Sequence, residues 1–254
     1  MEGAMSVKSA VRVLRIFELL SIHKEGLSNK QICTYLKLPQ SSASGLIKTL
    51  LDENYLSLNE SNHFILGAKL IPVGQAAMES FNLSNLGVED LKALMLRVEE
   101  TVFMATLVDH ELIYIAKIDS NRSIRTSAFL GGKKPLYCTG LGKAYLAYMP
   151  HEKRETYIHQ TELEPITDHT ITDKEELKTK LIDYQKQGYA IDDEENEEGL
   201  YCLAAPIFNS TGEMEAAISV AGPKARMLKH EANIVQHVKN TANMISSKLG
   251  YRGG

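Results

Sequence analysis

Apolar residues follow a helical spacing at the start of the chain. From Ser6 to Leu20 they recur every three or four positions, while most charged residues fall on other faces, as in an amphipathic helix. After Gly26, the sequence Ser28-Asn29-Lys30-Gln31 has the spacing of a capping box. It predicts a second, short helix that ends near Tyr35.

A turn and a third helix come next. Pro39 lacks an amide donor and pushes the preceding residue out of the helical region, so the chain must turn across Leu36–Pro39. We expect the polar stretch Gln40–Ser44 to supply hydroxyl groups that cap the following helix. The apolar face of that helix extends to about Glu53.

A hairpin follows the three helices. Tyr55–Leu58 and His63–Leu66 are β-prone runs, and the turn formers Asn59–Asn62 separate them. Three helices followed by a hairpin make a winged helix-turn-helix. In this fold the second helix of the helix-turn-helix pair is shaped to enter a DNA major groove.

Helical and strand-like patterns alternate in the rest of the chain. Two hairpins are predicted, from Thr101–Val108 with Leu112–Ile118 and from Leu200–Phe208 with Glu215–Ala221. Helical spacing recurs at Val88–Val98, Gly140–Tyr148, His151–His159, Asp173–Gln187 and Lys229–Leu249. Helices interspersed with paired strands predict an α+β domain on an antiparallel sheet flanked by helices.

The pattern divides the chain into three parts. Ala68–Leu83 is helix-prone apart from Pro72 and precedes the change of pattern, so we interpret it as a linker. We therefore predict a winged helix-turn-helix DNA-binding domain at residues 1–67, a linker helix at residues 68–86 and a sensor domain at residues 87–254.

Charge is distributed unevenly along the chain. The 254 residues have a net charge of −4, yet residues 1–51 carry seven basic and three acidic side chains, a net charge of +4. A basic segment attracts DNA phosphates, so this distribution permits DNA binding by the N-terminal domain. No run approaches ~18 apolar residues and no signal peptide is evident, so we expect a cytosolic protein without a membrane partner.

Several chemistries are disfavoured. The three cysteines, Cys33, Cys138 and Cys202, form no C-x-x-C pair, and the histidines show no metal-binding spacing, so neither a metal site nor a cofactor is expected. Gly140–Ala144 departs from the P-loop pattern. The acidic run Asp192–Glu198 lacks the ligand spacing of an EF-hand, and we interpret it as a solvated face. No catalytic nucleophile–base pair is predicted.

Four blocks of the sequence carry a resemblance to a known family. They are Ser6–Leu14, Pro135–Ala144, Gly188–Glu195 and Glu198–Pro206. In this order they resemble the IclR family of bacterial transcription regulators along nearly the whole chain. Lys117-Ile118-Asp119-Ser120 and Pro135-Leu136-Tyr137 are similar to the branch of sugar-acid catabolism regulators that includes KdgR.

The resemblance implies a GAF-like effector-binding domain at the C-terminal end. It also implies homodimers or homotetramers on palindromic double-stranded DNA operators, and a small carboxylate or aromatic acid as effector. Carried over position by position, it implies that the effector-binding residues are Gly140, Leu141, Asp192, Cys202 and Ser219. Amides at a helix N-terminus favour a carboxylate, whereas Asp192 beside an anion would have to accept from a ligand hydroxyl.

The candidate DNA contacts lie on the third helix and in the hairpin. They are Gln40, Ser41, Ser42, Ser44, Lys48 and His63. Glutamine can read adenine, while serine and lysine mostly bind phosphates. Each serine has the alternative role of capping the helix. The family usually has basic residues where this chain has Gln40 and Gly45, so base specificity cannot be carried over.

These observations favour a repressor whose DNA binding a small acid, such as a sugar acid or keto acid, relieves. Two alternatives stay open. The C-terminal domain could be an enzyme that converts a small organic acid while the DNA-binding domain localises it, or it could be purely a dimerisation or protein-interaction domain.

Overall fold

The chain forms two compact units, each with its own core. The computed structural model describes residues 7–80, 82–109, 111–123, 126 and 128–252. The units are Met1–Ser80 and Phe81–Gly254, so the division falls inside the predicted linker. No helix in the described part of the chain combines the length and the apolar character that crossing a bilayer requires.

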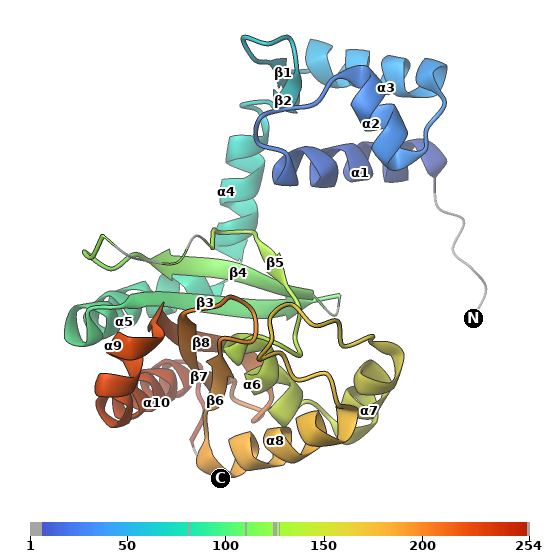
Figure 1. Ribbon diagram of the computed structural model, residues 1–254. Helices are drawn as coiled ribbons and strands as arrows, with labels where there is room; N and C mark the ends of the chain where they lie inside the picture. The colour runs from blue at the N-terminus through green and yellow to red at the C-terminus, as the bar shows by residue number, and fades with distance from the viewer. Residues whose placement is uncertain (1–6, 81, 110, 124–125, 127, 253–254) are drawn as a thin grey trace. The chain divides into compact units, whose positions relative to one another are not determined.

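The first unit is a winged helix-turn-helix (Figure 1). Its elements are α1 (Lys8–Ile22), α2 (Asn29–Leu36), α3 (Gln40–Asp52), β1 (Leu56–Leu58), β2 (Phe64–Leu66) and α4 (Leu70–Ser80). Buried aliphatic side chains from the first three helices, among them Ile16, Ile32 and Ile47, form its core. The predicted hairpin is confirmed, because β1 and β2 pair antiparallel with Leu56 opposite Leu66.

The predicted capping box is present at α2, but the predicted hydroxyl caps of α3 are absent. The Ser28 amide donates to Gln31 Oε1 over 2.8 Å, and the Gln31 amide donates to Ser28 Oγ over 3.4 Å. At α3 the N-cap is Pro39, which offers no side-chain acceptor. The expectation that Gln40–Ser44 caps this helix is therefore wrong, since Pro39 starts the helix early enough to place the serines inside it.

The second unit is an α+β domain with one antiparallel sheet between two helical layers. Its strands are β3 (Thr101–Val108), β4 (Glu111–Ile118), β5 (Lys133–Lys134), β6 (Ala190–Asp193), β7 (Leu200–Phe208) and β8 (Met214–Pro223), in the order β5-β4-β3-β8-β7-β6. Its helices are α5 (Asn82–Val98), α6 (Gly140–Tyr148), α7 (His151–Gln160), α8 (Lys174–Gln187), α9 (Lys224–Lys229) and α10 (Glu231–Lys248). Figure 1 shows α5 and α10 on one side of the sheet and α6 and α8 on the other.

The two-residue period of the strands separates the two cores. Val102 and Met104 belong to the core under α5 and α10, whereas Phe103 and Ala105 belong to the core under α6. Every second residue of β3, β7 and β8 therefore faces α6. This face is where the sheet and the N-terminus of α6 enclose a cavity.

The prediction missed the short elements of this unit. The edge strands β5 and β6 have two and four residues, too few for an alternating pattern to stand out. The six-residue helix α9 was missed, and the last helix was predicted to begin at Lys229 rather than Glu231. In place of one linker helix the structure has α4 and the start of α5, and Phe81 between them lies outside the described residues.

Gly142 lies where α6 closely approaches the preceding segment, so the position should not accept a side chain. A Cβ at this position would lie 2.4 Å from the backbone oxygen of Leu136, so Gly142→Ala forces the backbone apart. We expect it to destabilise the second unit by roughly 1–3 kcal/mol or more in calorimetric unfolding. Gly45→Ala in α3 is the control, because its Cβ would meet nothing within 4 Å. An unchanged melting temperature for Gly142→Ala would contradict the packing described.

Candidate functional site

The exposed face of α3 gathers most of the predicted DNA contacts. Ser41, Gly45 and Lys48 follow one another at helical spacing and are all exposed, opposite the buried Ala43, Ile47 and Leu50. Gln40 and Ser44 flank this face and are exposed as well. One positive side chain and several hydrogen-bonding groups are thus presented to solvent on a single helix face.

Ser42 and His63 are placed differently from the other predicted DNA contacts. Ser42 is half-buried at the edge of this face. His63, just before β2, is also half-buried, and its amide donates to Asn59 Oδ1 over 2.9 Å. Ser44 has a structural role, since its hydroxyl donates to the Gln40 carbonyl over 2.8 Å and accepts from Asn29 Nδ2 over 2.9 Å. That second bond connects α3 to α2.

All five residues predicted to bind the effector line one cavity in the second unit. We call it the α6 pocket; it encloses about 130 Å³, and Gly140, Leu141, Asp192, Cys202 and Ser219 are among its lining residues. Strand register explains why residues so distant in sequence meet. Asp192 on β6 lies opposite Cys202 on β7, which lies opposite Ala221 on β8. Ser219 is two residues from Ala221 and therefore faces the same side of the sheet.

The N-terminus of α6 lines this pocket with Gly140 and Leu141. The Gly142 amide donates to the N-cap hydroxyl of Thr139 over 3.1 Å, and the Lys143 amide donates to the Thr139 carbonyl over 2.8 Å. The amides of Gly140 and Leu141, the first two of the helix, have no acceptor within the helix. Because the N-terminal end of a helix is partially positive, this wall of the pocket suits an anionic oxygen.

Asp192 is a buried carboxyl group on β6, beside the N-terminus of α6. Its side chain is 2% exposed, and its Oδ1 accepts from the amides of Glu195 at 2.9 Å and Asn196 at 3.4 Å. Burial outweighs these bonds and the charge of Lys143, and raises the pKa of Asp192 to about 7. A protonated Asp192 can donate a hydrogen bond to an anion, which removes the conflict expected between two acids.

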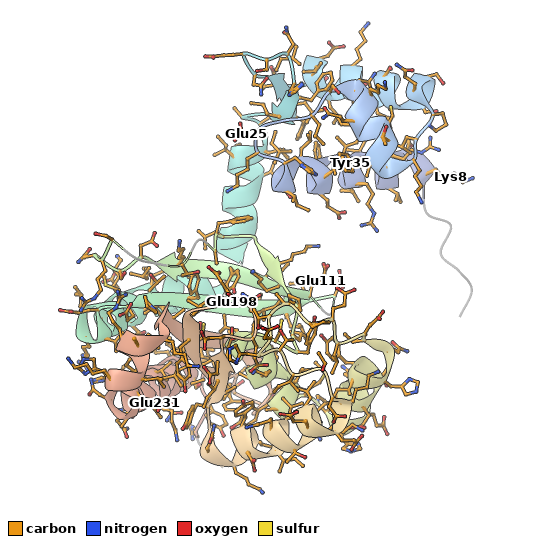
Figure 2. The ribbon with its side chains drawn as sticks, in the orientation of Figure 1. Lys8, Glu25, Tyr35, Glu111, Glu198 and Glu231 are labelled. Carbon is orange, nitrogen blue, oxygen red and sulfur yellow. The ribbon has the colours of Figure 1, made fainter. Side chains whose placement is uncertain are left out.

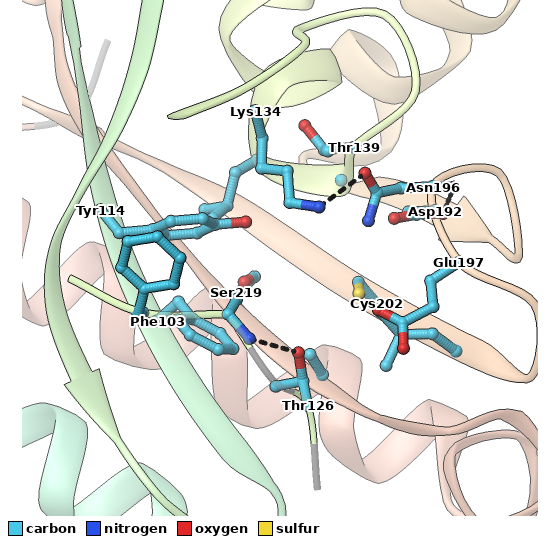
Figure 3. A pocket seen from close by; sticks show the side chains of 16 residues that line it. Phe103, Tyr114, Thr126, Lys134, Thr139, Asp192, Asn196, Glu197, Cys202 and Ser219 are labelled. Carbon is cyan, nitrogen blue, oxygen red and sulfur yellow. Dashed lines mark hydrogen bonds between the residues drawn. The ribbon is translucent and has the colours of Figure 1, made fainter. Parts of the chain in front are cut away.

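Further lining residues escaped the sequence analysis. Figure 3 shows Phe103, Tyr114, Thr126, Lys134 and Asn196 around the same cavity. Phe103 and Tyr114 stack with ring centroids 5.1 Å apart and form its apolar side. Burial raises the pKa of the Tyr114 hydroxyl and of the Cys202 thiol, so both stay protonated and can donate. The alternation in β3 and β4 is the one signal that could have identified Phe103 and Tyr114.

The acidic run Asp192–Glu198 is not exposed to solvent as a whole, because several of its carboxylates pair with lysines. Lys224 Nζ lies 2.7 Å from Asp193 and 2.5 Å from Glu194, while the buried Glu195 pairs with Lys143. Glu198 is exposed (Figure 2). The interpretation of this run as a solvated face is wrong for Asp192 and Glu195, because the loop turns these two carboxylates inward.

Lys143 and Glu195 form an ion pair beneath the pocket. Lys143 on α6 is fully buried, Glu195 is 4% exposed, and Glu195 Oε2 has no hydrogen-bond partner among the described residues. Lys143 Nζ also lies 5.6 Å from the centre of the Tyr184 ring. Removing one charge of such a pair leaves the other buried and uncompensated.

We expect Lys143→Met to destabilise the second unit strongly. Loss of one partner of a buried pair costs about 3–5 kcal/mol, which for a unit of this size lowers the melting temperature by roughly 10 °C. The double variant Lys143→Met/Glu195→Met removes both charges and should recover most of that loss in scanning calorimetry. If both variants melt at the wild-type temperature, removal of Lys143 does not leave a destabilising buried charge on Glu195, and the inference is wrong.

The raised pKa of Asp192 predicts a pH dependence of stability. The folded pKa of about 7 exceeds the ordinary value of 3.8, so the folded state holds a proton that the unfolded state releases. Stability from this group is complete below pH 4 and is lost as the pH rises through 7. Asp192→Asn should therefore gain stability relative to wild type between pH 5 and pH 8, by up to a few kcal/mol.

Asp193→Asn is the control for this measurement. Its carboxylate is exposed and paired with Lys224, so its stability difference from wild type should stay nearly constant over the same pH range. Melting temperatures of the three proteins, measured in one buffer series, test both statements. A constant difference between wild type and Asp192→Asn would show that Asp192 is ionised throughout.

The two units match the two parts of one protein family. Residues 9–60 match the IclR helix-turn-helix domain, and residues 75–247 match the domain described as bacterial transcriptional regulator IclR C-terminal. Both parts of the chain therefore match domains of this family.

Individual relatives give the same result. The transcriptional repressor IclR of Escherichia coli is 34% identical over 87% of this chain and 82% of its own length. The regulator KdgR of Dickeya chrysanthemi is 30% identical over 97% of this chain and 81% of its own length. The crystal structure of Thermotoga maritima IclR superposes with a TM-score of 0.77 at 30% identity, covering 96% of this chain and 99% of that one. Identity to KdgR does not exceed identity to IclR, so these values do not separate the sugar-acid branch from the rest. The chain belongs to the IclR family of bacterial transcriptional regulators.

Proposed function

We propose that the protein is a repressor whose binding to an operator is released by a small carboxylate. The observation that carries the proposal is the α6 pocket, where the free amides of Gly140 and Leu141 face protonatable and hydroxyl side chains across one cavity. Relatives named as repressors, among them IclR of Escherichia coli, support the sign of the regulation.

The pocket suits a compact acid with at least one further oxygen. Its volume of about 130 Å³ is close to the ~150 Å³ of an engineered protein cavity that binds benzene, so a ligand of about six non-hydrogen atoms fits without rearrangement of the lining. The carboxylate would bind the amides at the start of α6. Asp192, Cys202 and Ser219 would bind a keto or hydroxyl oxygen, as a keto acid or a small sugar acid supplies.

DNA recognition is assigned to the exposed face of α3. Gln40 would contact a base edge in the major groove, and Ser41, Ser44 and Lys48 would bind phosphates. One such helix covers only a few base pairs. A homodimer or homotetramer on a palindromic operator therefore follows from the need for two half-sites.

For the acid to control DNA binding, the dimer must have two conformational states that differ in their affinity for the acid. Binding in the α6 pocket would favour the state in which the two α3 helices no longer match the spacing of the half-sites. The connection along the chain runs through residues 68–86, the predicted linker.

Thermal shift and DNA binding together test this function. Pyruvate, glyoxylate, 2-keto-3-deoxygluconate and benzoate are each added to the purified protein. An acid present at 100 times its Kd should stabilise the second unit by about 2.7 kcal/mol, or roughly 5–10 °C. The same acid should weaken binding to an operator selected from random duplex DNA, measured by fluorescence anisotropy.

Ser219→Ala should lose most of the thermal shift. Ser247→Ala, an exposed serine on α10, is the matched control and should keep it. Stabilisation by none of the acids, or stabilisation without any change in DNA affinity, would contradict the proposal. Conversion of an acid into a product during incubation would instead support an enzyme.

A further inference from the structure

Lys134 projects from the edge strand into the α6 pocket. The two residues of β5 follow the alternation of a strand, so neighbouring lysines point to opposite sides. Lys133 pairs with Glu111 at the exposed edge, where Figure 2 labels Glu111. Lys134 lines the pocket (Figure 3) and is half-buried.

The partner of Lys134 is an amide and not a carboxylate. Its Nζ lies 3.3 Å from Asn196 Oδ1, and within the described part of the chain it forms no salt bridge within 4.0 Å. The neighbouring loop nevertheless supplies carboxylates to Lys143 and Lys224. In the middle of this acidic run, the residue that meets Lys134 is the one neutral side chain, Asn196.

This arrangement leaves a cation facing the cavity with no carboxylate of the described residues within salt-bridge distance, although Glu197 also lines the cavity. A half-buried ammonium group is stabilised by an anion more than by a neutral amide, because the attraction between two opposite unit charges adds to the hydrogen bond. The free amides of Gly140 and Leu141 add positive potential to the same cavity. Asp192, a buried acid of the same lining, is partly protonated near neutral pH because burial raises its pKa to about 7, and it therefore opposes an anion less.

We propose that Lys134 is the specificity-determining cation of the α6 pocket and pairs directly with the carboxylate of the bound acid. When no acid is bound, Asn196 accepts a hydrogen bond from the ammonium group of Lys134. When an acid enters, its carboxylate replaces Asn196 as the partner of that ammonium group. Lys134 thereby selects acids against their neutral amides. The inference rests on the proposed function, since it assigns the residue that recognises the charge of the proposed effector.

The experiment compares the affinities of two proteins for two forms of one ligand. Titration calorimetry measures wild type and Lys134→Met against whichever of pyruvate, glyoxylate, 2-keto-3-deoxygluconate and benzoate gives the largest thermal shift, and against the primary amide of that acid. Wild type should bind the acid about 10- to 100-fold more tightly than Lys134→Met does. Both proteins should bind the amide with similar, weak affinity.

Matched variants separate charge recognition from damage to the fold. Lys133→Met removes a lysine of the same strand that faces outward, and it should keep the wild-type preference for the acid. Lys134→Gln is neutral but polar, and it should lose the preference as Lys134→Met does. Lys134→Arg should recover part of it. The melting temperature of each variant without ligand confirms that it is folded.

The outcomes distinguish this inference from the proposed function. If wild type binds an acid and Lys134→Met and Lys134→Gln bind it equally well, the assignment of Lys134 is wrong while the sensor function stands. Equal binding of acid and amide by wild type also overturns the assignment. If no acid binds wild type, the proposed function fails and the assignment fails with it.

Discussion

The ion pair between Lys143 and Glu195 is the interaction on which the second unit most depends. It joins the first turns of α6 to the loop after β6, so the two walls of the α6 pocket are held by one pair of charges. Lys143 is fully buried, and within the described part of the chain Glu195 has no other cation in salt-bridge range. The position of Asp192, three residues before Glu195, follows from this anchoring, as does the position of Asn196 after it.

The burial that requires Lys143 and Glu195 to pair also changes the protonation of the neighbouring Asp192. Asp192 shares the dry interior but has no cation of its own, so its proton is retained up to about neutral pH. Of the two acids that line the pocket, Asp192 and Glu197, Asp192 therefore carries only part of its negative charge near neutral pH. The amides at the start of α6 and the ammonium group of Lys134 are the groups of the lining that would attract an anion.

The long, periodic elements could be predicted from the sequence, and the short ones could not. The helices of the first unit, the capping box of α2 and the two long hairpins of the sheet all have patterns that exceed one period. The five residues expected at the effector site lie together because the resemblance placed them and strand register brings Asp192, Cys202 and Ser219 to one face. Lys134 and Asn196 had no such signal. A two-residue strand has no measurable alternation, and which member of an acidic run turns inward depends on a lysine buried 52 residues away in sequence.

The floor of the α6 pocket is built from very small residues. Gly140 has Ala204 and Cys202 as its nearest neighbours across the interface, at 3.5 Å from where a Cβ would be, and Ala128 and Ala221 line the cavity as well. The space for a ligand thus exists because side chains are missing rather than because the backbone opens. Exchanging one methyl or methylene group at these positions reshapes the cavity without disturbing the sheet. A lineage with this scaffold can change the acid to which its genes respond through single substitutions, while the fold and the DNA-binding unit stay the same.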